Sequence, residues 1–414
     1  MHPRFNDRSP SVVVWAPGHD ELDRRVNRVV EVLGHLGARV AIVYDDTFAG
    51  RTGSPIVSTA TICLLKNQRR GVVAAFLGIK KWLSSIDGRV DLLYIHDSGL
   101  FGLMLAVLAA RRRRGIRIVF DYHDWIPWEI WYQWSKLVHW SCLARGLAQI
   151  TQHLVLPWLG KGVSFRGIVG ISPAQLVGLR ESISVSHRVP GITIPNTRRR
   201  LPEPEREFAS GALTLLWVGN IMEGRDLDLL LDYVEALRRD VSGFCFSVLI
   251  IGKVLSVPML LRLKAVPYVR HVAGFSNDGN LLELVAKTRA VGVFLGWNDV
   301  AATGINQVAS PNKVYSYVNI GIPVIYARSL EAVGRVIPEP AGMSVGSFIE
   351  FREAVLSLDR SYSTCVAAVR ELRKRIMWDD EAKDCLEGFL AGLLGLDHGT
   401  MASDAVLPSA PPCI

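Results

Sequence analysis

Short apolar runs alternate with amphipathic helical segments along most of this chain, and the alternation limits the folds that the chain can adopt. Apolar runs at 11–16 and 39–44 flank a segment in which Val and Leu recur at helical spacing. Strands that alternate with helices form parallel sheets, because each helix returns the chain to the edge where the previous strand began. The chain is therefore predicted to be an α/β protein. The other expected strands are 61–65, 91–95, 117–120, 167–171, 192–194, 213–218, 244–251, 269–273, 290–295 and 323–326.

Length and composition favour two domains. The chain has 414 residues, of which 49% are hydrophobic, which suits two α/β domains of about 200 residues each. The segment 195–211 holds three prolines and an arginine triplet and is the expected linker. We predict domains at 1–200 and 201–396, followed by a disordered Pro/Ser/Ala-rich tail at 397–414.

Polar residues follow five of the expected strands in the first half of the chain. In parallel sheets, ligands bind beyond the carboxyl ends of the strands. These positions are therefore predicted to gather at a functional edge. They are Gly18, His19 and Asp20; His96 and Asp97; His123 and Asp124; Ser172; and Asn196.

The stretch 310–325 is predicted to form a loop, a short helix and a buried strand. Pro311 suits a first helical turn and Gly321 suits the position just after a helix. The helix start offers backbone N–H groups with Ser310, Asn312 and Lys313, which together favour an anion such as phosphate. An ordinary helix with a proline start and a glycine stop remains the alternative.

The positive charge is concentrated in the first half of the chain. Residues 1–200 carry 27 Lys and Arg against 14 Asp and Glu, whereas residues 201–414 carry 20 against 25. Such asymmetry favours contact of the first half with an anionic surface. The basic residues form no recognised nucleic-acid module, so an anionic membrane is the preferred partner. An aromatic-rich segment, 125–158, is either an interfacial helix at that membrane or a lid or core helix packed on the sheet.

Neither metal binding nor membrane insertion is indicated. The six cysteines form no Cys-x-x-Cys pattern, so we interpret them as reduced thiols of a cytosolic protein without structural zinc. The Asp226-Leu-Asp228 motif is interpreted as first-turn acids that favour a helix, not as a metal site. The N-terminus lacks the apolar region of a signal peptide, and no apolar run reaches about 18 residues.

Several segments together resemble the GT-B glycosyltransferases, and in particular glycosyltransferase family 4 and its relatives that build exopolysaccharides and other surface glycans. The resemblance covers about residues 11 to 394. It implies two Rossmann-like domains that face each other across a cleft. The supporting segments are 14–26, 91–97, 120–124, 170–172, 194–196, 217–221, 274–275 and 310–324.

The resemblance implies roles for residues of the first domain. Gly18 would let the backbone approach the donor diphosphate and the acceptor. His96 takes the place of a histidine near the transferred sugar, and His123 on the next strand is the competing candidate. The implied reaction retains the anomeric configuration, and the implied acceptor is a glycan or a polyprenyl-diphosphate-linked sugar at the inner face of the cytoplasmic membrane.

The resemblance places the nucleotide sugar, with UDP or GDP, in the second domain. Gly219 and Arg225 match residues that contact the diphosphate, whereas Asn220 replaces a family cation. Ser316 replaces a glutamate that holds the ribose and is a weaker hydrogen-bond partner. No further cofactor and no metal are expected, because cations and the helix dipole stabilise the leaving diphosphate.

Three other functions compete with that of a glycosyltransferase. A non-catalytic GT-B-like partner in a glycan assembly complex is favoured by the substitutions at Asn220 and Ser316. A nucleotide-sugar epimerase shares the architecture. A dehydrogenase is disfavoured, because no Gly-x-Gly-x-x-Gly sequence follows the strands 11–16 and 213–218.

Overall fold

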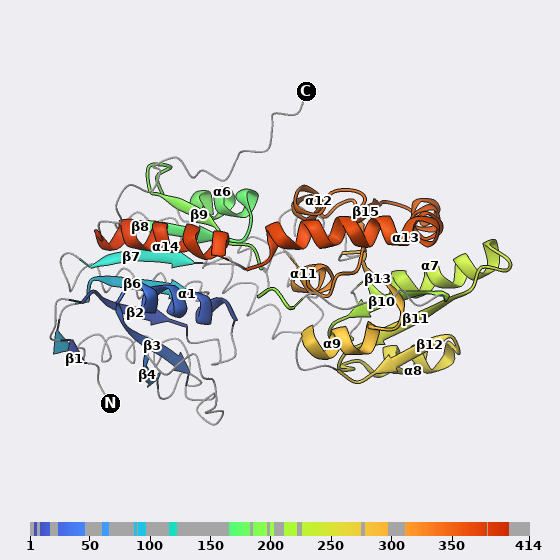
Figure 1. Cartoon of the computed structure of the whole chain (residues 1–414). Coiled ribbons are helices and arrows are strands. Elements are labelled where there is room, and N and C mark those ends of the chain that lie inside the picture. The colour runs from blue at the N-terminus through green and yellow to red at the C-terminus, as the bar shows by residue number, and fades with distance from the viewer. Residues whose placement is uncertain are drawn as a thin grey trace. The chain divides into compact units, whose positions relative to one another are not determined.

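The chain forms two compact units, Met1–Ile194 with Asp380–Ile414, and Pro195–Asp379 (Figure 1). Each unit is described by itself. The computed structural model describes residues 4–5, 9–16, 24–45, 60–65, 87–88, 90–96, 116–121, 165–182, 185–196, 199–202, 211–221, 226–274, 278–296, 311–378 and 380–396.

The first unit contains a parallel sheet of seven strands in the order β4-β3-β2-β6-β7-β8-β9. A separate pair joins β1 (Arg4–Phe5) to β5 (Asp87–Gly88). The sheet strands are β2 (Ser11–Trp15), β3 (Arg39–Asp45), β4 (Ala60–Leu65), β6 (Leu92–His96), β7 (Arg117–Asp121), β8 (Phe165–Gly170) and β9 (Gly191–Thr193). The described helices are α1 (Arg24–His35), α6 (Pro173–Ser182) and α14 (Asp380–Leu394).

The second unit contains a parallel sheet of six strands in the order β12-β11-β10-β13-β14-β15. Its strands are β10 (Leu213–Val218), β11 (Phe246–Ile251), β12 (Val269–Val272), β13 (Arg289–Phe294), β14 (Val324–Ala327) and β15 (Gly342–Val345). Its described helices are α7 (Leu227–Asp240), α8 (Val257–Ala265), α9 (Asp278–Val285), α11 (Asn312–Asn319), α12 (Glu331–Val336) and α13 (Phe348–Ile376).

Both sheets have the doubly wound strand order, so the predicted α/β class with two parallel sheets is confirmed. The order reverses between β2 and β6 in the first sheet and between β10 and β13 in the second. These reversals are the switch points at which doubly wound sheets bind ligands. Every strand predicted from the sequence is present, whereas β1, β5 and β15 were not predicted. β1 and β5 have only two residues each, and the Gly-Met-Ser-Val sequence of β15 has no continuous apolar run.

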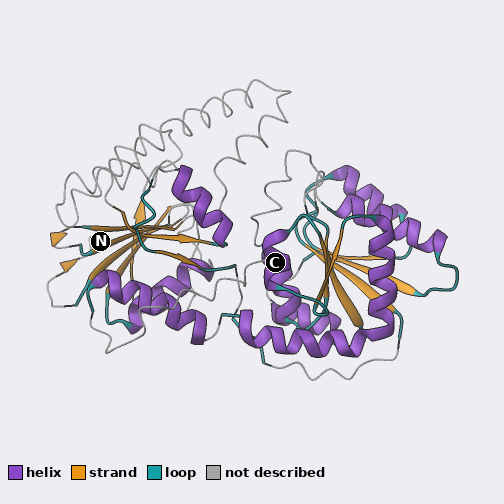
Figure 2. Cartoon of the chain, turned by 90° about the horizontal axis from the view of Figure 1, so that it is seen from above, coloured by secondary structure: helices purple, strands orange, loops and turns teal. Residues whose placement is uncertain are grey.

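Helices cover both faces of the second sheet (Figure 2). Helices α7 and α8 bury their apolar residues on one face, and α9, α11 and α12 bury theirs on the other. The long helix α13 serves both faces, because its backbone leaves helical geometry at Ser361. Phe351 lies before this kink in the first core, and Val369 lies after it in the second.

The division between the units differs from the predicted domains at both ends. Asn319 of α11 holds the start of the expected linker: its Nδ2 donates to the carbonyl of Arg199 at 3.0 Å, and its Oδ1 accepts from the N–H of Leu201 at 3.1 Å. The second unit thus begins at Pro195 and not at the predicted residue 201. Helix α14, expected in the second domain, packs instead against α1 of the first, where Lys383 lies 3.9 Å from Glu31.

A tyrosine fills the switch point of the second sheet. Strands β10 and β13 pair as far as Leu216 and Gly292 and then separate. The hydroxyl of Tyr317 bridges the gap, accepting from the N–H of Val218 at 3.0 Å and donating to the carbonyl of Val293 at 3.3 Å. Gly292 leaves room for the ring, since a Cβ there would lie 2.3 Å from Tyr317. The tyrosine thus satisfies two buried backbone groups that the strands no longer offer each other.

We expect Tyr317→Phe to destabilise the second unit by about 1–3 kcal/mol, because two buried backbone groups lose their partner. Tyr326→Phe is the matched control: it removes one buried hydroxyl, which donates to the carbonyl of Ile337 at 3.2 Å. Hydrogen–deuterium exchange of the peptide covering β10 should accelerate in the Tyr317 variant and not in the control. Equal exchange in both variants would show that the hydroxyl does not hold the strands.

Candidate functional site

Buried polar side chains form a cluster beside the switch point of the first sheet. Tyr94 and His96 lie on one face of β6, because they are two residues apart on a strand. Asp121 is the last residue of β7 and lies opposite His96 in the register of the two strands. Arg25 comes from the first turn of α1, across from these strands. The Asp121 cluster is therefore built from three elements that are distant in sequence.

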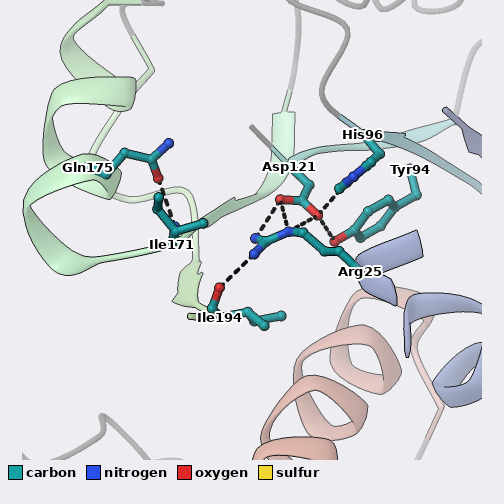
Figure 3. A network of polar contacts seen from close by, with 7 residues as sticks. All are labelled: Arg25, Tyr94, His96, Asp121, Ile171, Gln175 and Ile194. Carbon is teal, nitrogen blue, oxygen red and sulfur yellow. Dashed lines mark hydrogen bonds and ion pairs between the residues drawn. The ribbon is translucent and has the colours of Figure 1, made fainter. Parts of the chain in front are cut away.

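Asp121 is the centre of this cluster (Figure 3). Arg25 binds its carboxylate with two nitrogens, Nη2 at 2.7 Å and Nε at 3.1 Å. The hydroxyl of Tyr94 lies 2.8 Å and the Nδ1 of His96 lies 3.0 Å from the other oxygen, Oδ2. The side chains of His96 and Asp121 are fully buried. Such a carboxylate is paired and hydrogen-bonded on both oxygens, as a buried charge must be.

The electrostatics of the cluster fix which groups carry protons. Burial opposes ionisation of Asp121, but Arg25 and His96 outweigh it and hold the pKa of this carboxyl well below its usual range. Burial, and then the charge of Asp121, raise the pKa of Tyr94 well above its usual value, so the phenol keeps its proton. An ionised Asp121 can only accept, so the Nδ1 of His96 donates to it and, in the neutral ring, Nε2 is the acceptor.

Arg25 also binds Ile194, the last residue of the first segment of this unit. Its Nη1 donates to the carbonyl of Ile194 at 2.7 Å, at the end of β9 (Figure 3). Ser172, one of the polar strand ends, begins helix α6, where its Oγ accepts from the N–H of Gln175 at 3.1 Å. The side chain of Gln175 in turn accepts from the N–H of Ile171 at 2.8 Å. The described contacts of Ser172 thus assign it to a helix cap.

A second cluster surrounds Lys313 in the second unit. The Nζ of Lys313 lies 3.5 Å from Oδ1 of Asp226, an ion-pair distance longer than a short hydrogen bond. The same nitrogen lies 4.2 Å from the ring centroid of Trp217 and 4.4 Å from that of Phe294, within range of cation–π attraction. Asp226 also accepts from the N–H of Leu295 at 3.0 Å. The side chain of Lys313 is 13% exposed and that of Asp226 is fully buried.

Asp226 is less well compensated than Asp121. Burial raises its pKa above the usual value, and Lys313, Trp217 and the Leu295 amide oppose that rise only in part. The ammonium of Lys313, predicted to meet a phosphate, therefore already faces an internal carboxylate. Its positive charge is partly neutralised within the protein.

Gly219 lies beside this cation at the end of β10. Its φ of +149° is a conformation that other residues rarely adopt, and a Cβ there would lie 3.4 Å from the Nζ of Lys313. A Cβ on Gly252, at the end of β11, would lie 1.7 Å from the carbonyl oxygen of Gly219. The structure thus brings the predicted residues Gly219 and Lys313 together. The backbone of Gly252 lies close to that of Gly219.

The short helix predicted within 310–325 is present as α11, with a different start. Pro311 is the residue before the helix, and Asn312, the first helical residue, is exposed, as is Asn220. Ser316 is buried and donates its hydroxyl proton to the carbonyl of Asn312 at 3.2 Å. Toward a ligand it can therefore offer only its oxygen lone pairs.

Other predicted site residues lie outside the described residues. They are Gly18, His123, Arg225 and Ser310, together with the aromatic segment 125–158. Their roles remain predictions.

Sequence reasoning missed the partners of the two predicted side chains His96 and Lys313. Asp121 carried a signal, since it directly follows the predicted strand 117–120. Asp226 was noticed as the start of a helix, but its side chain turns to Lys313 and makes no cap hydrogen bond. Arg25 and Tyr94 lie within predicted elements, and only the fold shows that they face Asp121.

The described residues contain neither a metal-binding cluster nor a helix suited to cross a membrane. No group of three or more His, Cys, Asp or Glu among them is placed to hold a metal ion. In the same part of the chain, no helix combines the length and apolar character needed to span a membrane.

The fold resembles many solved structures. A glycosyltransferase from Rickettsia africae is 12% identical, with 94% of this chain and 99% of that chain covered and a TM-score of 0.60. Anabaena HepE in complex with UDP is 11% identical, with 93% and 99% covered and a TM-score of 0.63. A structure described as trehalose-6-phosphate from E. coli bound with UDP-2-fluoro glucose is 13% identical, with the same coverage and TM-score. No protein-family model and no curated protein matches the chain. These similarities support the predicted GT-B fold.

We expect Arg25→Met to cost about 3–5 kcal/mol at neutral pH, because it leaves the buried Asp121 carboxylate without its cation. Arg180→Met is the matched control. Arg180 is also buried, but its guanidinium donates to the carbonyls of Ser186 and Val189, so its loss should cost only about 1–3 kcal/mol. Urea unfolding followed by circular dichroism measures both.

The stability lost in Arg25→Met should depend on pH. The native pKa of Asp121 is depressed, so its contribution is complete above the ordinary aspartate pKa of about 4 and is lost as pH falls below it. The stability difference between wild type and Arg25→Met should therefore shrink on acidification, because a protonated Asp121 needs no cation. A difference that stays constant from pH 7 to acid would contradict the ion pair.

Proposed function

We propose that this chain is a glycosyltransferase that moves a sugar from a nucleotide-diphosphate sugar to a glycan or lipid-linked acceptor. The main support is the pairing of a GT-B-like fold with polar clusters beside the switch points of both sheets. Ligands of doubly wound sheets bind at such points. The proposal places the donor in the second unit, at Gly219 and the start of α11.

UDP and a UDP-sugar are bound in two of the similar structures, which supports a nucleotide-sugar donor for this chain. The first amides of α11, with Asn312, would meet the diphosphate. Lys313 would contribute less than a free cation, because Asp226 lies 3.5 Å away. Binding of the diphosphate would therefore depend more on Arg225 and Ser310. Asn220 and Ser316 complete the proposed donor site.

The first unit would receive the acceptor. His96 is held by Asp121 with its Nε2 as the acceptor atom, so it is suited to hold a hydroxyl of the transferred sugar or to take a proton. Gly18 and His123 belong to the same proposed region. Retention of configuration, a polyprenyl-linked acceptor, a role in exopolysaccharide synthesis and a cytoplasmic location at the membrane are the finer parts of this proposal.

A second candidate is a non-catalytic GT-B-like partner in a glycan assembly complex. It is favoured by the partly neutralised charge of Lys313 and by the hydroxyl of Ser316, which donates within its own helix. Such a protein would bind a nucleotide sugar without turning it over. Thermal shift with UDP- and GDP-sugars, followed by assay of nucleotide release, separates the two candidates.

We expect His96→Ala to lower turnover of the stabilising nucleotide sugar about 100-fold, because a positioned acid–base group contributes on that order. Nucleotide affinity should stay near wild type. His123→Ala should have a smaller effect, and His187→Ala, a change at an exposed histidine, should have none. Nucleotide release is measured by chromatography and affinity by calorimetry. A larger loss at His123 than at His96 would reverse the assignment.

A further inference from the structure

Helix α8 of the second unit has an apolar face that the core does not use. Met259 and Leu263 are buried in the core under the helix. On the outer side, Val257 is 70% and Leu261 is 63% exposed, and Leu255 just before the helix is 54% exposed. These are three of the five large hydrophobic side chains that the described residues expose. A gathered apolar surface of this kind indicates a binding partner.

Positive charge surrounds these three side chains. Residues 241–277 contain four Lys and Arg and no Asp or Glu, although the second half of the chain is acidic overall. Arg262 is paired with Asp228 and Asp232 of α7 at 2.6 and 2.5 Å. The other cations, Lys253, Lys264 and Arg270, are exposed and form no ion pair with another described residue.

Two of these cations, Lys253 and Lys264, share one surface with the apolar side chains. Val257, Leu261 and Lys264 are spaced by four and three residues, so they lie along one side of the helix. Arg270 belongs to β12, the edge strand beside α8 (Figure 1), but it pairs with Leu249 and so lies on the other face of the sheet, away from α8. Lys253 precedes Leu255 by two residues. Apolar side chains flanked by uncompensated cations are the composition of a surface that lies on an anionic bilayer.

We propose that this surface, the α8 face, docks on an anionic membrane. Leu255, Val257 and Leu261 enter the boundary between lipid headgroups and acyl chains. Lys253 and Lys264 lie against lipid phosphates. The α8 face shares no residue with the aromatic segment 125–158 or with the proposed donor site.

A second copy of the chain fits this surface less well. In a two-fold symmetric contact the same patch meets itself, so Lys253 and Lys264 would face the same cations of the other copy. Like charges would then approach one another without the carboxylates that a cationic patch requires. An anionic bilayer meets both the apolar and the cationic residues of the α8 face.

Vesicle flotation of the full-length protein tests the proposal. We expect binding to phosphatidylcholine vesicles that contain phosphatidylglycerol and none to phosphatidylcholine alone. The variant L255S/V257S/L261S should bind at least about tenfold more weakly, because partial burial of three aliphatic side chains is lost. The control V177S/I349S removes the two exposed aliphatic side chains found on α6 and α13 and should bind like wild type.

Charge reversal is a second, independent variant. K253E/K264E leaves the apolar side chains in place and should abolish binding at low salt, where electrostatic attraction is strongest. If circular dichroism shows that the triple serine variant does not fold, this variant still tests whether the α8 face binds anionic vesicles.

Three results would overturn the proposal. The first is wild-type affinity in both surface variants, which would place membrane contact elsewhere. The second is failure of the wild-type protein to float with anionic vesicles. The third is a change from dimer to monomer in the serine variant with unchanged vesicle binding, because that would assign the α8 face to a second copy.

Discussion

Where the strand order of a doubly wound sheet reverses, two parallel strands separate and their last backbone groups lose each other as partners. In the second unit, side chains close this gap. Tyr317 takes the N–H of Val218 and the carbonyl of Val293, and Asp226 takes the N–H of Leu295. Tyr317 belongs to α11, so these hydrogen bonds also fix the position of α11. The place of Lys313 beside Gly219 follows from the position of α11.

The two units compensate a buried carboxylate in different ways. Asp121 has a bidentate arginine, a phenol and an imidazole, and its pKa is depressed. Asp226 has one ammonium at 3.5 Å and one backbone amide, and its pKa is raised by burial. The Asp121 cluster is therefore a satisfied network that fixes the orientation of His96. The Asp226 pair is the one whose charge balance an anion near Lys313 would change.

Local pattern was enough to predict much of the fold. The strands were predictable because each is a short apolar run bounded by turn residues. Gly321 was predictable as a helix stop: it has φ +75°, and its N–H and that of Ile322 bond back to the last turn of α11. The packing of α14 on the first unit was not predictable, because its apolar periodicity does not say which core it joins.

Only those residues of the candidate site that are recognisable from their local sequence position could be predicted. His96 and Lys313 stand out by position at a strand end and a helix start. Arg25 and Asp121 are 96 residues apart, and no local feature of α1 marks Arg25 as the partner of Asp121. The contact between Asp226 and Lys313 likewise depends on the position of α11, which no local sequence feature shows.

The central claim is that the second unit binds a nucleotide diphosphate at its switch point. Hydrogen–deuterium exchange of the intact protein, with and without saturating UDP or GDP, tests it most directly. The account predicts slower exchange in peptides that cover the end of β10 and the start of α11, around Gly219 and Lys313. Protection confined to other peptides, or none with either nucleotide, would contradict it.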